Sequence, residues 1–276
     1  MRIVSLLPSA TEIICGLGLR ENLVGVTHEC DFPADVRELP HVTHSKISAT
    51  ATSAQIDNAV REQLRGQSSL YALDQKLLES LEPDLIVTQT LCEVCAVAES
   101  EVQRAIANLK NRPKILNLEP LTLGDLYHSI HQVAHAANCP DRGEEYVSSL
   151  RHRVNSVVAR NQDLKSRPRT LILEWIDPLF CAGHWNPELV ELAGGREMIG
   201  KIGERSKSIS WQDLVATSPE FMMIACCGFN IERTLQDIPL LELHAEWSLL
   251  PCVRSNRVYV VDGSAYFNRP GPRADR

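Results

Sequence analysis

The sequence predicts an α/β protein with two Rossmann-like lobes of mostly parallel sheet, joined by a long backbone helix. Short apolar runs typical of buried strands alternate with stretches of helical periodicity in both halves of the chain, and this alternation indicates βα units. A helical stretch without strand patterns separates the two halves. The expected boundaries are an N-terminal lobe over residues 1–121, a helical linker over 122–167 and a C-terminal lobe over 168–276.

In the N-terminal lobe, the expected strands are short apolar runs bounded by turn or cap residues, and the expected helices fill the intervals between them. The strands cover residues 3–7, 23–26, 85–88 and 115–118. The helices cover approximately residues 11–16, 53–63, 74–81 and 97–109. Strands connected by helices in this way pair in parallel, so their carboxyl ends gather at one edge of the sheet.

The linker is predicted from helical spacing and from one proline. Leu126, Ile130 and Val133 recur at helical intervals. Pro140 is tolerated only in a first turn, so a second helix begins there and extends to about residue 164. At 1.5 Å per residue it is roughly 35 Å long, enough to lie across two lobes. The βα pattern then resumes, with strands at 171–173, 221–225 and 258–261 and helices at 187–193 and 211–216.

Composition limits the function classes. The 276 residues are 44% apolar and 23% charged, as in a soluble globular protein, and the net charge of −7 argues against a nucleic-acid partner. No run of about 18 apolar residues predicts a membrane span. The apolar run at 3–7 is interrupted at Pro8, which makes it too short for a secretory signal. Nine cysteines, an odd number, do not indicate a disulfide framework. A cytoplasmic location is expected, with the periplasm as the alternative.

Three loops that contain cysteine each follow a predicted strand directly. They contribute Cys30, the pair Cys92 and Cys95, and Cys227. Ligands of open α/β sheets bind at the carboxyl ends of the strands, so these loops are expected to converge on one site. Four thiolates there would hold a zinc ion or an iron–sulfur cluster. A disulfide and ordinary buried thiols are the alternatives that the sequence leaves open.

Histidines and aromatic residues occupy similar loops. His28 and His184 are candidate ligands for a metal or for the metal of a corrinoid, although a hydrogen-bonded loop histidine is slightly the more typical role for each. The C-terminal lobe carries aromatic side chains in loops, suited to line a site for a planar or bulky ligand or else to pack in the core. These are Trp175, Phe180, Trp185, Phe229, Tyr266 and Phe267. Arg269 lies in a rigid Pro/Gly loop and can meet ligand carboxylates or amides. The sequence contains neither a phosphate-binding loop nor a nucleophile elbow. These motifs therefore give no reason to predict an enzyme, and no catalytic residues are assigned.

The order of these segments resembles the helical-backbone (class III) solute-binding proteins of ABC importers, over essentially the whole chain. The resemblance begins with residues 3–12, 17–18, 24–26 and 80–86. It is more specific to a subgroup labelled cobalamin-binding that often lacks a signal peptide. That similarity lies in residues 28–31, 91–97, 182–189, 227–229 and 266–273. Because relatives continue into a further helix, the C-terminal lobe is expected to be incomplete at Arg276.

The resemblance implies a binding protein that holds a cobalamin-like corrinoid or another metal chelate in the cleft between two lobes, with limited hinge motion. An ABC importer is the implied partner, although the absence of a signal peptide disfavours it. The expected ligand-binding residues are Pro8, Ser9, His28, Glu29, Trp175, Phe180, His184, Trp185, Phe229, Tyr266, Phe267 and Arg269. The alternative is a cytosolic metal- or iron–sulfur-containing redox protein on the same fold, which uses the clustered cysteines.

Overall fold

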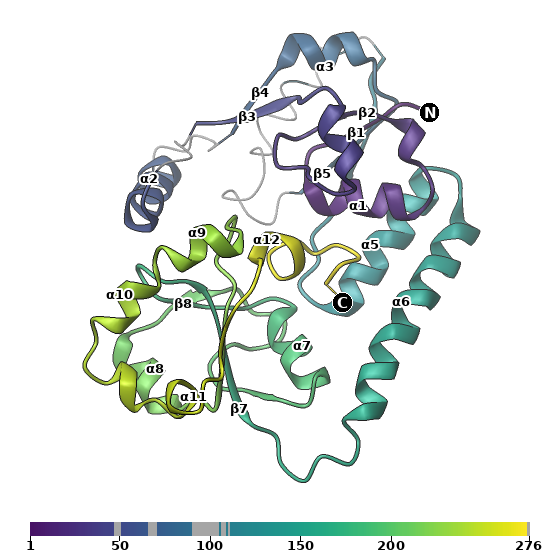
Figure 1. The fold of residues 1–276 in the computed structure, drawn as a ribbon. Helices are drawn as coiled ribbons and strands as arrows, with labels where there is room; N and C mark the ends of the chain where they lie inside the picture. The colour runs from purple at the N-terminus through teal and green to yellow at the C-terminus, as the bar shows by residue number, and fades with distance from the viewer. Residues whose placement is uncertain (47–50, 66–70, 90–104, 106–108, 110, 275–276) are drawn as a thin grey trace. The chain divides into compact units, whose positions relative to one another are not determined.

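The computed structural model confirms the predicted α/β class and divides the chain into two compact units (Figure 1). It describes the chain except for residues 47–50, 66–70, 90–104, 106–108, 110 and 275–276. Unit 1 comprises Met1–Glu119 and Asp125–Ser149, and unit 2 comprises Pro120–Gly124 and Leu150–Arg276. One long helix, α6 (Pro140–Arg160), contributes residues to both units. It begins at the proline, as predicted, but ends four residues before the expected position 164.

Unit 1 is built on a parallel four-stranded sheet in the order β2-β1-β5-β6. The strands are β1 (Ile3–Ser5), β2 (Leu23–Val26), β5 (Leu85–Thr88) and β6 (Lys114–Asn117). Strand β1 lies in the interior of the sheet, where Ser5 pairs with Val26 on one side and Val87 on the other. It is two residues shorter than predicted because Leu7 is already the N-cap of the next helix.

The helices of unit 1 begin where local sequence signals place them. Pro8 occupies the first turn of α1 (Pro8–Gly16), so this helix starts three residues earlier than predicted. Asp74 caps α3 (Gln75–Leu81) by accepting a hydrogen bond from Leu77 N at 2.9 Å. The other helices are α2 (Ser53–Arg65), α5 (Leu123–Ala136), η1 (Arg20–Asn22) and η2 (Ala34–Glu38). Most of the helix predicted at 97–109 lies outside the described residues.

An antiparallel pair of strands in unit 1 was not predicted, and neither were the short helices η1 and η2. The short strands β3 (Thr43–Ser45) and β4 (Tyr71–Leu73) form an antiparallel pair in which Thr43 lies opposite Leu73. Strand β3 consists of a threonine, a histidine and a serine, which give no apolar alternation from which a strand could be predicted.

Unit 2 contains a mixed six-stranded sheet in the order β10-β8-β7-β11-β12, with β9 paired to β7. The strands are β7 (Arg169–Trp175), β8 (Phe180–Cys181), β9 (Arg196–Glu197), β10 (Lys207–Ser208), β11 (Phe221–Ile224) and β12 (Val258–Val260). Strands β7, β11 and β12 are parallel, whereas β8 runs antiparallel to both β7 and β10. The two-residue strands β8, β9 and β10 were not predicted, because periodicity needs a longer window.

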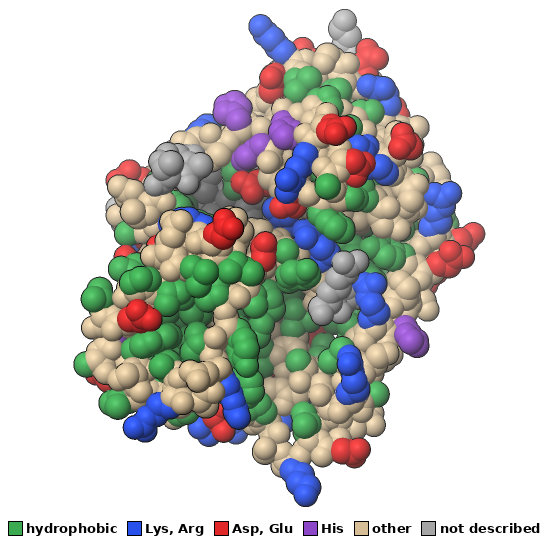
Figure 2. All heavy atoms as spheres, viewed as in Figure 1, with side chains coloured by type: hydrophobic (Ala, Val, Ile, Leu, Met, Phe, Trp, Pro, Cys, Tyr) green, Lys and Arg blue, Asp and Glu red, His purple; other side chains and the backbone are tan. Residues whose placement is uncertain are grey.

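The helices that lie wholly within unit 2 are short. They are α7 (Asn186–Leu192), α8 (Trp211–Thr217), α9 (Ile231–Leu235), α10 (Ile238–Glu242), α11 (Pro251–Arg254), α12 (Gly263–Tyr266) and η3 (Trp247–Leu249). Helix α8 is fixed by a capping box between Ser210 and Asp213. Some apolar side chains at the ends of these short helices remain on the surface. Examples are Leu243 after α10 and Leu249 at the end of η3, which are 81% and 60% exposed. Hydrophobic side chains form a large part of the face of unit 2 seen in Figure 2. Among the described residues, no helix combines the length and the hydropathy that a membrane crossing requires.

The close packing of β2 against α3 leads to a stability prediction. A Cβ atom at Gly25 would lie 2.6 Å from Leu81 Cδ1 and 3.1 Å from Val42 Cγ1. We expect Gly25→Ala to lower the free energy of unfolding by about 1–3 kcal/mol, because overpacking displaces buried neighbours. Gly124→Ala is the control, since there the nearest atom, Thr122 Oγ1, lies at 3.6 Å. Urea unfolding measures both variants, and a Gly25→Ala protein as stable as the wild type would contradict the described packing.

Candidate functional site

The loops at the carboxyl edge of unit 2 are placed by the pairing of β7 with β11. Leu173 lies opposite Ile224, so both strands end at nearly the same level. Beyond them, Ala225 N donates to Leu173 O at 2.8 Å, and Cys227 N donates to Glu174 O at 2.9 Å. The segment after β11 therefore remains beside β7 up to the point where Trp175 ends that strand.

Trp175 and Phe229 form an aromatic pair at this edge. Their ring centroids are 4.9 Å apart, and the ring planes are inclined at 41°. A turn places Phe229 there, because Phe229 N donates to Cys226 O at 3.1 Å and Gly228 adopts a φ of +75°. That φ favours glycine. Apart from Gly228 and its two chain neighbours, no atom of the described chain lies within 4 Å of the position that a Gly228 Cβ would occupy, so the turn borders open space.

The two rings differ in how much of their surface is covered. Phe229 is 9% exposed, and the Arg233 guanidinium carbon lies 4.1 Å from its ring centroid. Arg233 Nη1 lies 3.1 Å from Asp237 Oδ2, which holds the cation in place. Trp175 is only half-buried, and its Nε1 donates to Asp177 O at 2.9 Å. The available aromatic surface at this edge therefore belongs mainly to Trp175, because the Phe229 ring is in contact with both Trp175 and Arg233.

The segment after β12 is attached to the same turn by Asn268. Its Nδ2 donates to Cys226 O at 3.0 Å and to Ala225 O at 3.3 Å. A Cβ at Gly263 would collide with the carbonyl oxygen of Cys226, so only glycine allows this approach. Phe267 packs against the buried cluster that includes Ile172 and Ala225. Of the aromatic residues predicted in this segment, Phe267 is half-buried against this cluster and Tyr266 is 40% exposed.

A second loop of unit 2, between β8 and α7, carries His184 and Trp185. His184 has a φ of +56°, and its backbone N donates to Glu204 O at 2.6 Å. Burial and the nearby Arg205 lower the pKa of its imidazole. Trp185 is 7% exposed, with its ring centroid 5.6 Å from that of His184. Phe180 is half-buried on β8, and Arg269 is half-buried in the segment after α12.

At the carboxyl edge of unit 1, His28 lies in a network of hydroxyl groups. Its Nδ1 is 2.7 Å from Thr43 Oγ1, and its backbone N donates to the same oxygen at 3.2 Å. Thr43 Oγ1 in turn donates to Thr27 Oγ1 at 2.8 Å. The Tyr71 ring packs against the imidazole at a centroid distance of 5.0 Å. His28 Nε2 lies 3.4 Å from Glu29 Oε1, within ion-pair distance but without hydrogen-bond geometry.

The loop after β1 carries the other two residues expected in unit 1. Pro8 is half-buried at the start of α1, and Ser9 is 3% exposed within that helix. The neighbouring Ser5 hydroxyl donates to Leu7 O at 2.8 Å, which fixes the passage from strand to helix. Ser9 is therefore packed inside unit 1.

The predicted cysteine site is described only in part. Cys30 is buried, with its Sγ 3.0 Å from Thr11 Oγ1, and Cys227 is half-buried beside the turn at Gly228. Cys92 and Cys95 lie outside the described residues. Within the residues that the structure does describe, no three or more His, Cys, Asp or Glu side chains are grouped as a metal site requires. The zinc and iron–sulfur assignments therefore gain no support from the geometry and stay predictions.

Comparison with known proteins assigns the family. A family model described as "Periplasmic binding protein" matches residues 3–265. The chain belongs to the periplasmic binding protein family. This agrees with the resemblance noted in the sequence to solute-binding proteins of ABC importers.

Individual members of this family are distant in sequence and similar in fold. The vitamin B12-binding protein of Vibrio parahaemolyticus is 22% identical over 274 residues, which cover 99% of this chain and 84% of that protein. The solved vitamin B12-binding protein BtuF of Vibrio cholerae has a TM-score of 0.68 at 19% identity, covering 99% and 92% of the two chains. The haem-binding protein RhuT of Roseiflexus sp. RS-1 has a TM-score of 0.73 at 21% identity, covering 99% and 93%. At these identities the solved structures show a shared fold.

Two polar residues that organise the candidate site were not predicted. Thr43 contacts His28 across 15 positions in sequence, and Asn268 contacts Cys226 across 42. A threonine in a three-residue strand carries no local signal. Asn268 lies within the motif 266–273 that supports the family resemblance, so its position in that motif was the available signal.

Adjacent thiols at the turn differ in environment, and this can be tested. Burial raises the pKa of the Cys226 thiol to about 12, partly offset by a hydrogen bond to Thr234. Cys227 is more exposed. Because the thiolate is the reactive form, we expect iodoacetamide to modify Cys227 at least about tenfold faster than Cys226 in the folded protein. Peptide mass spectrometry over a time course measures both rates. Equal rates in the native state would contradict the described burial.

Proposed function

We propose that this protein binds a cobalamin-like corrinoid, or another bulky metal-chelate ligand, at the loops that follow the strands. The observation that carries this proposal is the Trp175–Phe229 pair at the carboxyl edge of the unit 2 sheet, beside the open space at Gly228. Ligands of open α/β sheets bind at this edge. Relatives named for vitamin B12 binding and for haem binding support the same ligand class.

The chemistry of this edge suits a ligand with a flat apolar body and a polar periphery. The half-buried indole of Trp175 offers dispersion and stacking over a large surface. Beside it, Arg233 is held by Asp237 and keeps a positive charge next to Phe229. An arginine in this position can donate to amide oxygens or carboxylates at the edge of the ligand. Corrinoids carry amide side chains and haem carries carboxylates, so both meet this description.

A role in solute transport follows from the family, and we propose that an ABC importer accepts the bound ligand. The cytoplasmic location expected from the sequence stays a prediction, whereas the family is named for periplasmic proteins. Fractionation of native cells, followed by N-terminal sequencing of the purified protein, distinguishes the two compartments.

The ligand proposal predicts a large effect at Trp175. We expect Trp175→Ala to weaken binding of cobinamide, cobalamin or haem at least about tenfold, which corresponds to about 1.4 kcal/mol. Removal of a buried aromatic anchor typically costs about 2 kcal/mol or more. Isothermal titration calorimetry measures the affinities.

Tyr259→Ala is the matched aromatic control. Tyr259 is 47% exposed on β12 and stacks at 6.3 Å on Phe221, away from the loops after the strands. This variant should bind as the wild type does. Failure of the wild type to bind any of the three ligands at tens of micromolar would refute the proposed ligand class.

A further inference from the structure

Arg233 and Asp237 form an ion pair that is largely covered from solvent. Arg233 Nη1 lies 3.1 Å from Asp237 Oδ2, and the two side chains are 21% and 11% exposed. The backbone holds both residues in place. Asn230 Oδ1 accepts a hydrogen bond from Arg233 N at 2.9 Å, and Asp237 N donates to Thr234 O at 3.0 Å. The attraction between two charges is strong when so little water surrounds them.

This ion pair lies beside the aromatic pair. The Arg233 guanidinium carbon is 4.1 Å from the ring centroid of Phe229, which is 4.9 Å from that of Trp175. Burial is the main cause that raises the pKa of the Cys226 thiol, and Asp237 raises this pKa further whereas Arg233 lowers it. Both charges therefore act on the turn that carries Phe229. A ligand at Trp175 meets Arg233 together with its carboxylate, as a pair without net charge.

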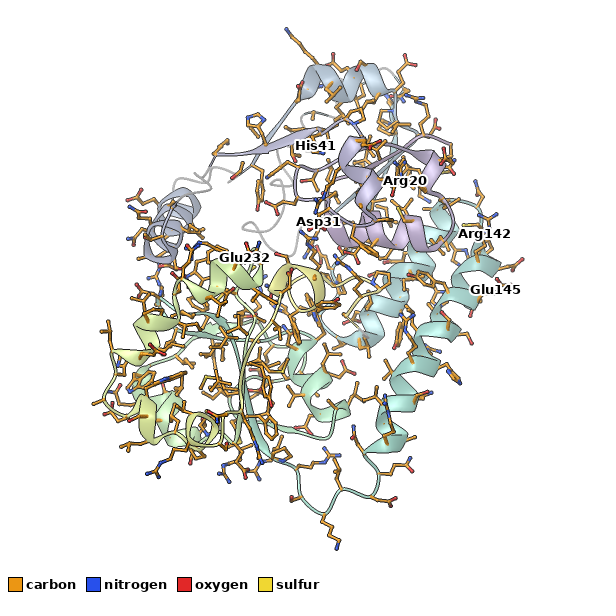
Figure 3. All side chains as sticks on the ribbon, in the orientation of Figure 1. Arg20, Asp31, His41, Arg142, Glu145 and Glu232 are labelled. Atoms are coloured by element: carbon orange, nitrogen blue, oxygen red, sulfur yellow. The ribbon has the colours of Figure 1, made fainter. Side chains whose placement is uncertain are left out.

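The charged side chains at the carboxyl edge of the unit 2 sheet are mostly acidic. They lie at or beyond the ends of β7, β11 and β12, within residues 174–177, 225–237 and 262–273. One of them is the exposed Glu232 on α9, which is labelled in Figure 3. The carboxylates are Glu174, Asp177, Glu232, Asp237 and Asp262, and the guanidiniums are Arg233, Arg269 and Arg273. Carboxylates outnumber guanidiniums, so the formal charge of these segments is negative.

We propose that Asp237 is a specificity-determining residue, through which the site selects ligands with a periphery of uncharged amides against ligands with carboxylates. This inference rests on the proposed function. A ligand carboxylate beside Arg233 competes with Asp237, which the chain already holds there, and the neighbouring carboxylates repel it. An amide oxygen accepts hydrogen bonds without a charge, so it approaches the same place without that repulsion.

Two corrinoids that share one macrocycle test the selectivity of the unsubstituted protein. Cobinamide carries amides at its periphery, and cobyrinic acid carries carboxylates there. With both as dicyano forms, we expect isothermal titration calorimetry at low salt to give cobinamide an affinity at least about tenfold higher. Raising the salt from about 0.01 M to about 1 M should narrow this ratio, because the Debye length falls from about 30 Å to about 3 Å.

The outcomes separate this inference from the proposed function. Binding of neither corrinoid would overturn the proposed ligand class, and the inference with it. Binding of both with equal affinity, or tighter binding of cobyrinic acid, would overturn the inference alone. A ratio that salt leaves unchanged would also overturn it, because the selection would then not depend on charge.

Substitution of Asp237 tests its role directly. Asp237→Asn leaves Arg233 as an uncompensated cation, so the affinity for cobyrinic acid relative to cobinamide should rise at least about tenfold. The double variant Arg233→Gln/Asp237→Asn removes both charges and should lose this gain. Circular dichroism checks that the variants fold. If Asp237→Asn does not fold, the salt dependence of the unsubstituted protein decides.

Glu220→Gln is the matched control. Glu220 Oε2 lies 3.5 Å from Arg169 Nη1 at the opposite edge of the sheet, where β7 and β11 begin. This variant changes the net charge by the same amount and should leave the ratio of the two affinities as in the wild type. An unchanged ratio in folded Asp237→Asn, or an equal rise in Glu220→Gln, would overturn the role of Asp237.

Discussion

The parallel pairing of β7 with β11 is the constraint on which the candidate ligand site depends. Leu173 lies opposite Ile224, and two further backbone hydrogen bonds keep the chain after β11 beside β7. Trp175 and Phe229, which are 54 positions apart in sequence, meet only because this register is kept. A slip of one residue would turn every side chain of a strand to its other face. The pairing of β7 with β11 therefore places the aromatic pair at this edge. Asn268 and Gly263 then keep the segment after β12 close to the Cys226 carbonyl in the neighbouring turn.

In unit 1, backbone pairing likewise brings together side chains that are distant in sequence, but these side chains are polar. Strand β2 ends at Val26, which forms a β-bridge with His41, so that His28 just after β2 meets Thr43 at the start of β3. Here the contacts are polar, and the imidazole is held by contacts of its Nδ1 with Thr43 Oγ1 at 2.7 Å and with Thr27 Oγ1 at 3.4 Å. The two units thus present different functional groups at the ends of their parallel strands: an imidazole and a carboxylate in unit 1, and an indole with a neighbouring guanidinium in unit 2.

The sequence predicted the elements whose signals are local. Continuous apolar runs gave the strands around Ile3, Leu85 and Met222, and Pro140 gave the start of the long helix. Strands of two residues, such as β8 and β10, and helices of four or five residues, such as α11, are too short to show periodicity. For the site, the sequence identified strand-end loops but not the role of each residue. Phe267 is half-buried against the core cluster, and Ser9 is buried in α1, because side-chain direction depends on packing between distant segments.

The central claim is that a corrinoid or similar ligand binds where Trp175 and Phe229 meet. Hydrogen–deuterium exchange with and without cobinamide tests it most directly, because it reports on each segment of the native chain. The account predicts slower exchange in residues 225–230 and around Trp175 when ligand is bound, since the amide of Phe229 closes the turn at Gly228. Protection should be smaller at the exposed Tyr259 on β12. Ligand binding that leaves exchange at 225–230 unchanged would contradict the claim.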